Sequence, residues 1–353
     1  MWRTATTAGQ QRAFDTDDAA IFSAGSGTAT ISTLINGGVV NASAVTFASG
    51  AGAYTITGGT RLELTGAAGT GITNNSTSLQ TISSALRLDG ANRTINAASG
   101  NILISGSIDE DAGGARTLTK TGNQALTLSG NNSYTGTTTI SAGTLFANNA
   151  TSSTGTGAVS VASGATLGGS GTIATTSATG INVSGVLSPG ASVNTVGTLT
   201  FAMGGTTGKV TLANSASFAY QLGLGGADIT SVGGSDMISL TNASSGDFVF
   251  GTSGNNIDLQ NTGTNGFYKL FDTSSNNANT WTNLSFDSIT GVISSGLTYS
   301  NLASGKTATL LVGTNTNGGS LGDIYLSVVP EPSSALLAGL SSCLLFRRRR
   351  NRS

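Results

Sequence analysis

Residues 125–148 read ALTLSGNNSYTGTTTISAGTLFAN, and this stretch decides the fold class. Apolar side chains alternate with Thr and Ser on both sides of a glycine- and asparagine-rich middle, at Leu126, Leu128, Ile140 and Leu145. Alternation with a period of two predicts strands that bury one face. Gly130 and Gly136 are expected to open turns, because glycine accepts backbone conformations that other residues resist. The stretch therefore predicts short strands joined by tight turns.

The same pattern recurs along most of the chain. Further alternating groups occur at 54–57, 61–65, 159–161, 181–183, 198–201, 210–212 and 237–240. Short, evenly spaced strands suit a β-sandwich, a barrel or a β-helix. The brevity of the strands, the tight glycine turns and an aromatic content of only 6% favour the β-helix. We expect about three strands per coil, with successive coils stacked roughly 4.8 Å apart.

Composition excludes several kinds of chemistry. The 353 residues include 52 Gly, no His and one Cys, Cys343, and only 9% of the chain is charged. Without histidine there is no Ser-His-Asp triad and no His metal ligand, and one cysteine cannot form an internal disulfide. Five of the 15 basic residues lie in the last seven positions, which leaves ten basic against 16 acidic residues in the body. This balance argues against nucleic-acid binding.

The deciding stretch resembles the autotransporter-associated β-strand repeat. The matching positions are Leu126, Leu128, Gly130, Asn132, Tyr134, Thr135, Gly136, Thr138, Gly143, Thr144 and Leu145. Residues 167–173 and 186–190 resemble the coil that usually follows such repeats. The resemblance implies an all-β, right-handed parallel β-helix in an exported protein. Tyr134 is expected to pack across a coil edge, with Leu126, Leu128, Ile140 and Leu145 in the core.

Aromatic residues divide the predicted body into two parts. We expect a β-solenoid over 1–214, with the repeat at 125–148. From about residue 215 aromatic residues gather, and 215–328 is expected to form a β cap or the last coils. A cap is needed because an open coil end exposes unpaired backbone. Residues 329–353 form a separate tail.

The tail has three consecutive parts. Two prolines stiffen Val329-Pro330-Glu331-Pro332, and residues 333–346 are uncharged and end at Arg347, Arg348, Arg349 and Arg350. The uncharged part predicts a short hydrophobic helix that anchors the chain in a membrane, through Leu336, Leu337, Leu340, Leu344, Leu345 and Phe346. An apolar run followed by arginines is typical of a segment whose basic end stays cytoplasmic. Fourteen residues span about 21 Å, less than the hydrocarbon core of roughly 30 Å.

This order of parts resembles the PEP-CTERM sorting signal. The resemblance implies that a membrane-embedded protease-transpeptidase, exosortase, recognises Pro330, Glu331 and Pro332, while the arginines stop transfer. It also implies export machinery as a partner and an intermediate tethered to the inner membrane before delivery to the cell surface or beyond. Because residues 1–20 lack the apolar core of a signal peptide, we expect the true start of the gene product upstream of Met1. Cys343 is expected to be an apolar filler, with lipidation as the alternative.

Acidic residues give little sign of a reaction centre. The densest group, Asp109-Glu110-Asp111, predicts a solvated turn, with a weak calcium site as the alternative. Glu63 alternates with two leucines and is expected to face solvent. The glycine-rich stretches lack the lysine of a phosphate loop. The sequence therefore predicts no catalytic residues, no metal and no cofactor.

Three functions are compatible with these observations. The leading hypothesis is a non-catalytic structural or adhesive protein of the surface or extracellular matrix, with exopolysaccharide or envelope glycans as ligands. A carbohydrate-active lyase or hydrolase is the alternative, and it predicts carboxylates that converge on one face. A self-secreting autotransporter passenger is disfavoured by the arginine tail.

Overall fold

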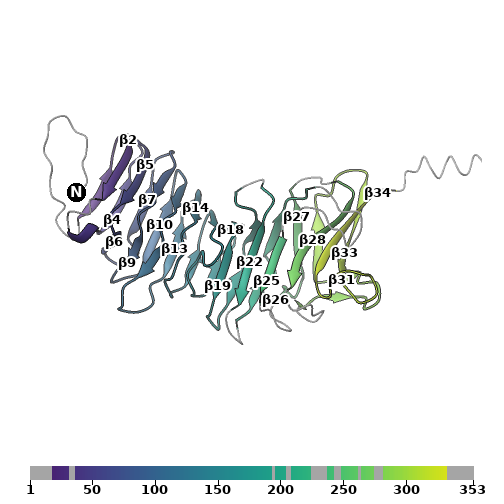
Figure 1. Ribbon diagram of the computed structural model, residues 1–353. Coiled ribbons are helices and arrows are strands. Elements are labelled where there is room, and N and C mark those ends of the chain that lie inside the picture. The colour runs from purple at the N-terminus through teal and green to yellow at the C-terminus, as the bar shows by residue number, and fades with distance from the viewer. Residues whose placement is uncertain are drawn as a thin grey trace, which may run out of the picture.

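Short strands stack in parallel from one coil to the next, and the stack makes the molecule elongated (Figure 1). The computed structural model describes residues 18–31, 36–192, 195–203, 208–223, 237–241, 248–260, 264–273 and 281–331. Every strand pair of the first two sheets is parallel, and a coil contributes one strand to each. The predicted all-β parallel solenoid is therefore confirmed.

Two long sheets form two sides of the stack. The first sheet contains β1 (Ala19–Phe22), β4 (Ala44–Phe47), β7 (Gly71–Asn74), β10 (Arg93–Ala97), β13 (Leu118–Thr121), β15 (Thr138–Ile140), β17 (Val159–Val161), β20 (Ile181–Val183), β23 (Val210–Leu212), β26 (Phe248–Val249) and β29 (Trp281–Thr282). The second contains β2 (Gly25–Ile31), β5 (Ala51–Gly58), β8 (Gln80–Ile82), β11 (Ile102–Ile104), β14 (Ala125–Leu128), β16 (Thr144–Ala147), β18 (Thr166–Gly169), β21 (Val186–Pro189), β24 (Ser217–Tyr220), β27 (Asn255–Leu259) and β32 (Leu297–Ser300).

The third side of the coil is shared by two shorter sheets. The third sheet consists of β3 (Val39–Ala42), β6 (Arg61–Leu64), β9 (Leu86–Leu88) and β12 (Ile108–Glu110). The fourth begins at β19 (Thr172–Thr175) and continues through β22 (Thr198–Met203), β25 (Met237–Thr241) and β28 (Gly266–Thr273). Between β12 and β19, two coils cross this side without a strand, at residues 129–137 and 148–158.

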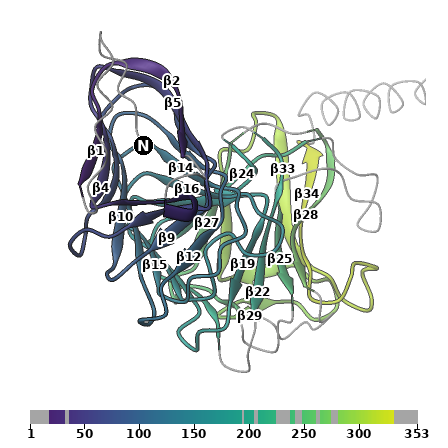
Figure 2. The ribbon, with the colours of Figure 1, turned by 60° about the vertical axis from the view of Figure 1, so that its left-hand side comes forward.

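An antiparallel hairpin closes the C-terminal end. Strand β34 (Ile324–Pro330) pairs antiparallel with β28 and with β33 (Lys306–Val312), which ends the parallel stacking of the fourth sheet. A small hairpin of β30 (Ser285–Phe286) and β31 (Ile293–Ser295) lies next to it. The view in Figure 2 shows β33 and β34 beside β28 at this end. Residues 215–328, predicted to form a β cap or the last coils, contain parallel coils as far as β32 (Leu297–Ser300) and most of this antiparallel hairpin.

The core is a set of ladders in which equivalent residues of successive coils touch. In the first sheet one ladder runs through Ile72, Ile95, Lys120, Ile140, Val161, Val183 and Leu212. Leu126, Leu128, Ile140 and Leu145 are all fully buried, as the sequence predicts. Tyr134, expected to pack across a coil edge, is also fully buried. Because burying one such aliphatic side chain contributes about 1.5–3 kcal/mol, each coil depends on its neighbours for stability.

Close coil contacts explain the two glycines of the repeat. A Cβ atom on Gly130 would lie 2.1 Å from the carbonyl oxygen of Gly106, and one on Gly136 would lie 2.2 Å from that of Arg116. Neither position has room for a side chain, so both glycines permit the turn to approach the preceding coil.

One short helical turn occurs in the described part of the chain. It is the 3-10 helix η1 (Asn36–Gly38), in the first coil. The predicted hydrophobic helix over residues 333–346 lies outside the described residues. Most of the aromatic residues after 215 that the structure describes face the core of the last coils, where Phe248, Phe271 and Trp281 contact one another.

Candidate functional site

The repeat coil replaces its missing third strand with side-chain hydrogen bonds. Asn132, only 2% exposed, lies where the third sheet ends at β12. Its Oδ1 accepts from the backbone N–H of Ile108 at 2.8 Å, and its Nδ2 donates to the carbonyl of Ser153 at 2.6 Å. Asn132 therefore links the coils on either side, and it satisfies backbone groups that a strand would otherwise pair.

Tyr134 continues this polar chain inside the coil. Its hydroxyl lies 2.6 Å from the hydroxyl of Thr138, which donates to the carbonyl of Thr154 at 3.0 Å. Burial raises the pKa of Tyr134 above its ordinary value, against the smaller opposing effect of the Thr138 hydrogen bond. The repeat tyrosine is thus a neutral packing residue whose one polar atom is satisfied.

Lys120 is a buried cation at the centre of the same repeat. It occupies the aliphatic ladder between Ile95 and Ile140 and is completely buried. Its Nζ donates to the carbonyls of Thr121, Gly122 and Ala142 at 2.8, 2.8 and 3.0 Å. Burial lowers the pKa of Lys120 to about 8. The interpretation of the sequence missed this residue, because a lysine is ordinarily assigned to solvent. Its spacing of two from Leu118 is the signal that places it on the inward face of β13.

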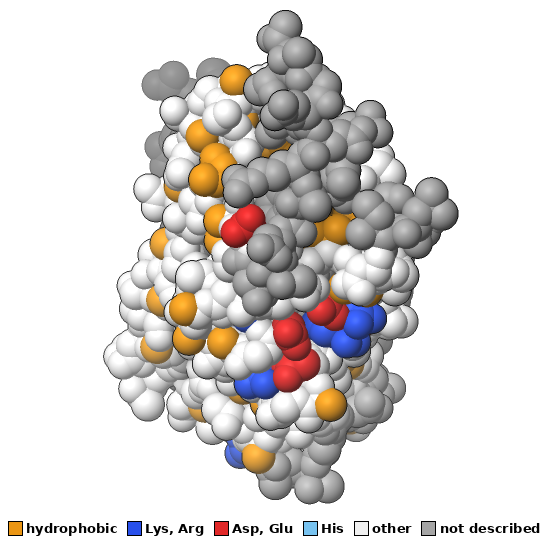
Figure 3. Space-filling model, turned by 90° about the vertical axis from the view of Figure 1, so that its left-hand side faces the viewer, with side chains coloured by type: hydrophobic (Ala, Val, Ile, Leu, Met, Phe, Trp, Pro, Cys, Tyr) orange, Lys and Arg blue, Asp and Glu red, His pale blue; other side chains and the backbone are white. Residues whose placement is uncertain are grey.

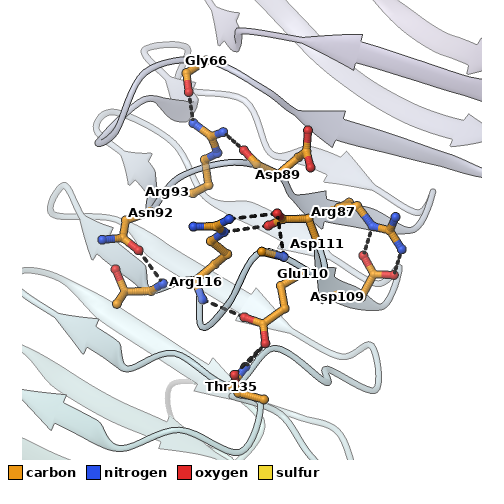
Figure 4. A network of polar contacts seen from close by, with 12 residues as sticks. Gly66, Arg87, Asp89, Asn92, Arg93, Asp109, Glu110, Asp111, Arg116 and Thr135 are labelled. Atoms are coloured by element: carbon orange, nitrogen blue, oxygen red, sulfur yellow. Dashed lines mark hydrogen bonds and ion pairs between the residues drawn. The ribbon is translucent and has the colours of Figure 1, made fainter.

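A ladder of opposite charges crosses the third sheet, and Figure 4 shows its Arg87–Asp109 pair. Strand register places Arg87 of β9 between Glu63 of β6 and Asp109 of β12. Both Nε and Nη2 of Arg87 donate to Asp109 at 3.0 Å, and Glu63 lies 3.7 Å from Nη1. Arg61 also contacts Glu63, at 2.5 Å. Glu63 points outward as expected, but Arg61 and Arg87 leave its side chain only 13% exposed.

The predicted acidic turn is instead the end of a strand, and its carboxylates diverge. Asp109 and Glu110 are the last residues of β12, so they point in different directions. Glu110 accepts from the backbone N–H of Arg116 at 2.7 Å and from that of Thr135 at 3.0 Å (Figure 4). Asp111 accepts two hydrogen bonds from the Arg116 guanidinium, at 2.6 and 2.8 Å.

Each carboxylate of this cluster is therefore committed to a structural partner. The hydrogen bonds from Arg116 hold the pKa of Asp111 well below its usual range. A general acid in a glycosidase needs the opposite shift. Among the residues that the structure describes, no group of three His, Cys, Asp or Glu side chains could hold a metal ion.

The N-terminal end of the molecule has few charged side chains outside one patch. In that view most charged side chains of the described residues gather in the patch, and the described surface around it is mainly backbone and uncharged polar side chains with scattered hydrophobic ones (Figure 3). Exposed Thr and Asn side chains bond from coil to coil, as where Thr151 donates to Asn131 at 2.9 Å. The body thus presents rows of hydroxyl and amide groups at the coil spacing.

The proposed sorting motif begins at the end of the cap. Pro330 is the last residue of β34, where it pairs with Lys306, and Glu331 donates its backbone N–H to the carbonyl of Gly305 at 2.9 Å. Both Pro330 and Glu331 are exposed. Pro332, the anchor leucines with Phe346, and the arginines at 347–350 lie outside the described residues. Within the described residues, no helix has the length and apolarity to cross a membrane.

Comparison with known families identifies the repeat. Residues 118–145 match a family model described as Passenger-associated-transport-repeat. The match begins at β13 and ends in β16, so it contains Lys120, Asn132 and Tyr134. Comparison with curated proteins gives no match. The matched repeat and the parallel solenoid together fit a surface-exposed or secreted β-helix protein.

Proposed function

We propose that this chain is an exported, non-catalytic solenoid of the cell surface or extracellular matrix, with a structural or adhesive role. Exosortase, the enzyme implied by the tail's resemblance, would sort it through Pro330, Glu331 and Pro332. The observation that carries the proposal is the uninterrupted parallel stack around a passenger-type repeat. Such a stack supplies length and a regular exterior.

The polar exterior supports an adhesive role. Hydroxyl and amide groups recur at the coil spacing, which suits hydrogen bonding to a polymer such as exopolysaccharide or an envelope glycan. The scarcity of charge, 9% of the chain, favours neutral partners over nucleic acid.

The position of the tail supports sorting after folding. Pro330 completes the cap, and the chain leaves the sheet at Glu331. Cleavage beyond this point would leave the pairing of β34 with β28 and β33 intact. A processing enzyme could therefore release the tail without opening the solenoid.

The test is processing of the full chain in a bacterium that carries an exosortase, with a peptide tag placed after Ser353. We expect the tag to be lost from the wild-type chain and retained in Glu331→Ala. A variant with Ser in place of Arg347–Arg350 should also keep the tag, or be secreted uncleaved. A wild-type protein that keeps its tag, or a Glu331→Ala protein processed at the wild-type rate, would contradict the proposal.

One observation favours the carbohydrate-active alternative: five carboxylates, at Glu63, Asp89, Asp109, Glu110 and Asp111, belong to one charged cluster. The purified body should be incubated with a panel of polysaccharides, and new reducing or unsaturated ends measured. We expect no turnover, with retention of the polymer on immobilised protein. Turnover that disappears in Asp109→Asn would establish the alternative.

A further inference from the structure

A lysine and two aspartates meet in the C-terminal cap. Nζ of Lys269 lies 2.8 Å from Oδ2 of Asp323 and 3.0 Å from Oδ1 of Asp272. Lys269 and Asp272 belong to β28, whereas Asp323 immediately precedes β34. The cluster therefore joins the last strand of the parallel stack to the strand that closes it.

A β-bulge in β28 creates this arrangement. Lys269 pairs with Tyr325 and Phe271 pairs with Ile324, so Leu270 is an extra residue on the β28 side. Leu270 and Phe271 are both completely buried as a result. Lys269 and Asp272, three residues apart, would face opposite sides of a regular strand, but the bulge brings them to the same side.

Both carboxylate oxygens of Asp323 have hydrogen-bond donors. It is 1% exposed, and its Oδ1 accepts from the backbone N–H of Thr273 at 2.8 Å and from the Thr273 hydroxyl at 3.2 Å. Its Oδ2 pairs with the ammonium of Lys269 and accepts a hydrogen bond from the Tyr325 hydroxyl at 3.3 Å. Two donors fixed on one oxygen resemble the arrangement that stabilises an oxyanion in acyl transfer.

We propose that Lys269 and Asp323 condense to form an intramolecular isopeptide bond. Thr273 would stabilise the charge on Oδ1, Tyr325 would protonate the departing Oδ2, and Asp272 would accept a proton from Lys269. The proposal is independent of the sorting function, because it concerns only the chemistry of the folded cap.

The step balances without an external reagent. The Lys269 ammonium gives one proton to Asp272, and its lone pair attacks Cγ of Asp323 to form the new C–N bond. The bond from Cγ to Oδ2 breaks, and Oδ2 leaves as water after taking up two protons that originate on Nζ. An ammonium and a carboxylate thus become a neutral amide and one water.

Charge pairing makes this reaction slow. Burial lowers the pKa of Lys269, but the hydrogen bonds to Asp323 and Asp272 outweigh it and hold that pKa above its ordinary value. The neutral amine that attacks forms only by transfer of a proton from the Lys269 ammonium to Asp272, and both protons of the leaving water come from Nζ, so the rate should be equal at pH 8 and pH 9. The bond would fasten β34 to the last full coil, next to the point where the tail leaves the body.

The experiment is intact-mass analysis of the purified, folded full chain during incubation at pH 8 and pH 9. The wild-type mass should fall by the mass of one water, and trypsin should no longer cut after Lys269. Lys269→Arg keeps a cation but should stay at full mass, whereas Asp323→Asn should lose ammonia instead of water. Lys306→Arg, at the edge of the cap, is the matched control and should still lose water.

The role of Asp272 as the acceptor of the Lys269 proton is tested by the rate of the mass loss. Asp272→Asn should slow the mass loss by at least about 100-fold without changing the final product, since general base catalysis contributes 10²–10⁴-fold. A rate equal to that of wild type would remove Asp272 from the mechanism. A folded wild-type chain that keeps its full mass after prolonged incubation at pH 9 overturns the proposal.

Discussion

The repeat region in the middle of the solenoid and the C-terminal coils share one topology but have different cores. In the repeat region one coil advances the chain by 20 residues, from Leu118 to its partner Thr138, and its core is narrow and aliphatic. Towards the C-terminus a coil advances by as many as 42 residues, from Asn255 to Leu297, and six aromatic rings fill the wider core. Coil length therefore sets the volume that side chains must fill, while the strand pairing stays constant.

The two regions also differ in how they place polar groups inside. The repeat buries Lys120 and Asn132 and satisfies them with backbone groups of the same and neighbouring coils. The C-terminal region buries Asp323 beside Lys269 at the edge of the cap, and the two polar groups of its ring cluster, the Tyr220 hydroxyl and the Trp281 indole N–H, donate to backbone carbonyls. Because each coil contacts only its neighbours, a substitution should change mainly the stability of the region that contains it.

The largest effect should come from the aromatic core. Phe271→Ala removes a ring that contacts Phe218, Phe248 and Trp281 at centroid distances of 5.2, 5.8 and 5.6 Å. We expect a loss of about 3–5 kcal/mol in the free energy of unfolding of this region. Urea unfolding followed by Trp281 fluorescence, in a Trp2→Phe background, measures it.

Phe267→Ala is the matched control on the same strand. Its ring is half-buried and lies outside the cluster, so the cost should be about 1 kcal/mol. Equal losses for the two variants would show that the rings do not form one core.

The next effect depends on pH and belongs to the repeat. The folded-state pKa of Lys120 is about 8 against an ordinary value of 10.5, so between these values the unfolded chain binds more protons. Stability should therefore rise with pH in this window, by about 3 kcal/mol at most. Lys120→Met should be more stable than wild type at pH 7, and its advantage should shrink towards pH 10.5. An advantage that does not change with pH would contradict the prediction.

A smaller loss is expected where the third strand is missing. Asn132→Ala leaves the Ile108 N–H and the Ser153 carbonyl without their side-chain partner, which should cost about 1–3 kcal/mol. Asn131→Ala, at the exposed neighbouring position, should cost less than about 0.5 kcal/mol. Thermal unfolding measures both losses. Equal losses for the two variants would show that the hydrogen bonds of Asn132 do not join the coils.

The smallest effect should be that of the surface charges. Arg87→Gln breaks the ladder between Glu63 and Asp109, but the Arg87 side chain is 26% exposed. We expect a loss of about 0.2–1 kcal/mol that falls as salt is added, because exposed pairs are screened. A loss above 2 kcal/mol that persists in high salt would identify the ladder as a major determinant of stability.

Sequence patterns predicted the strands better than the contacts between coils. Alternation identified Leu126, Leu128, Ile140 and Leu145 as core residues, whereas Tyr134, expected to pack across a coil edge, is fully buried. The contacts of Lys120, Arg87 and Asp323 could not be predicted, because they depend on which residues of successive coils face each other. That register follows from coil lengths, which vary from 19 to 42 residues. The bulge at Leu270 adds a further shift that alternation does not reveal.

The most direct test of the account is the spacing between coils in solution. Thr119, Thr139, Ser160 and Asn182 are outward-facing partners on four successive strands of the first sheet. In a Cys343→Ser background, spin labels should be placed at Thr119 and at each of the other three positions in turn. Parallel stacking predicts backbone separations that grow by about 4.8 Å per coil, to roughly 14 Å for Asn182. Separations that do not increase in equal steps would contradict the solenoid.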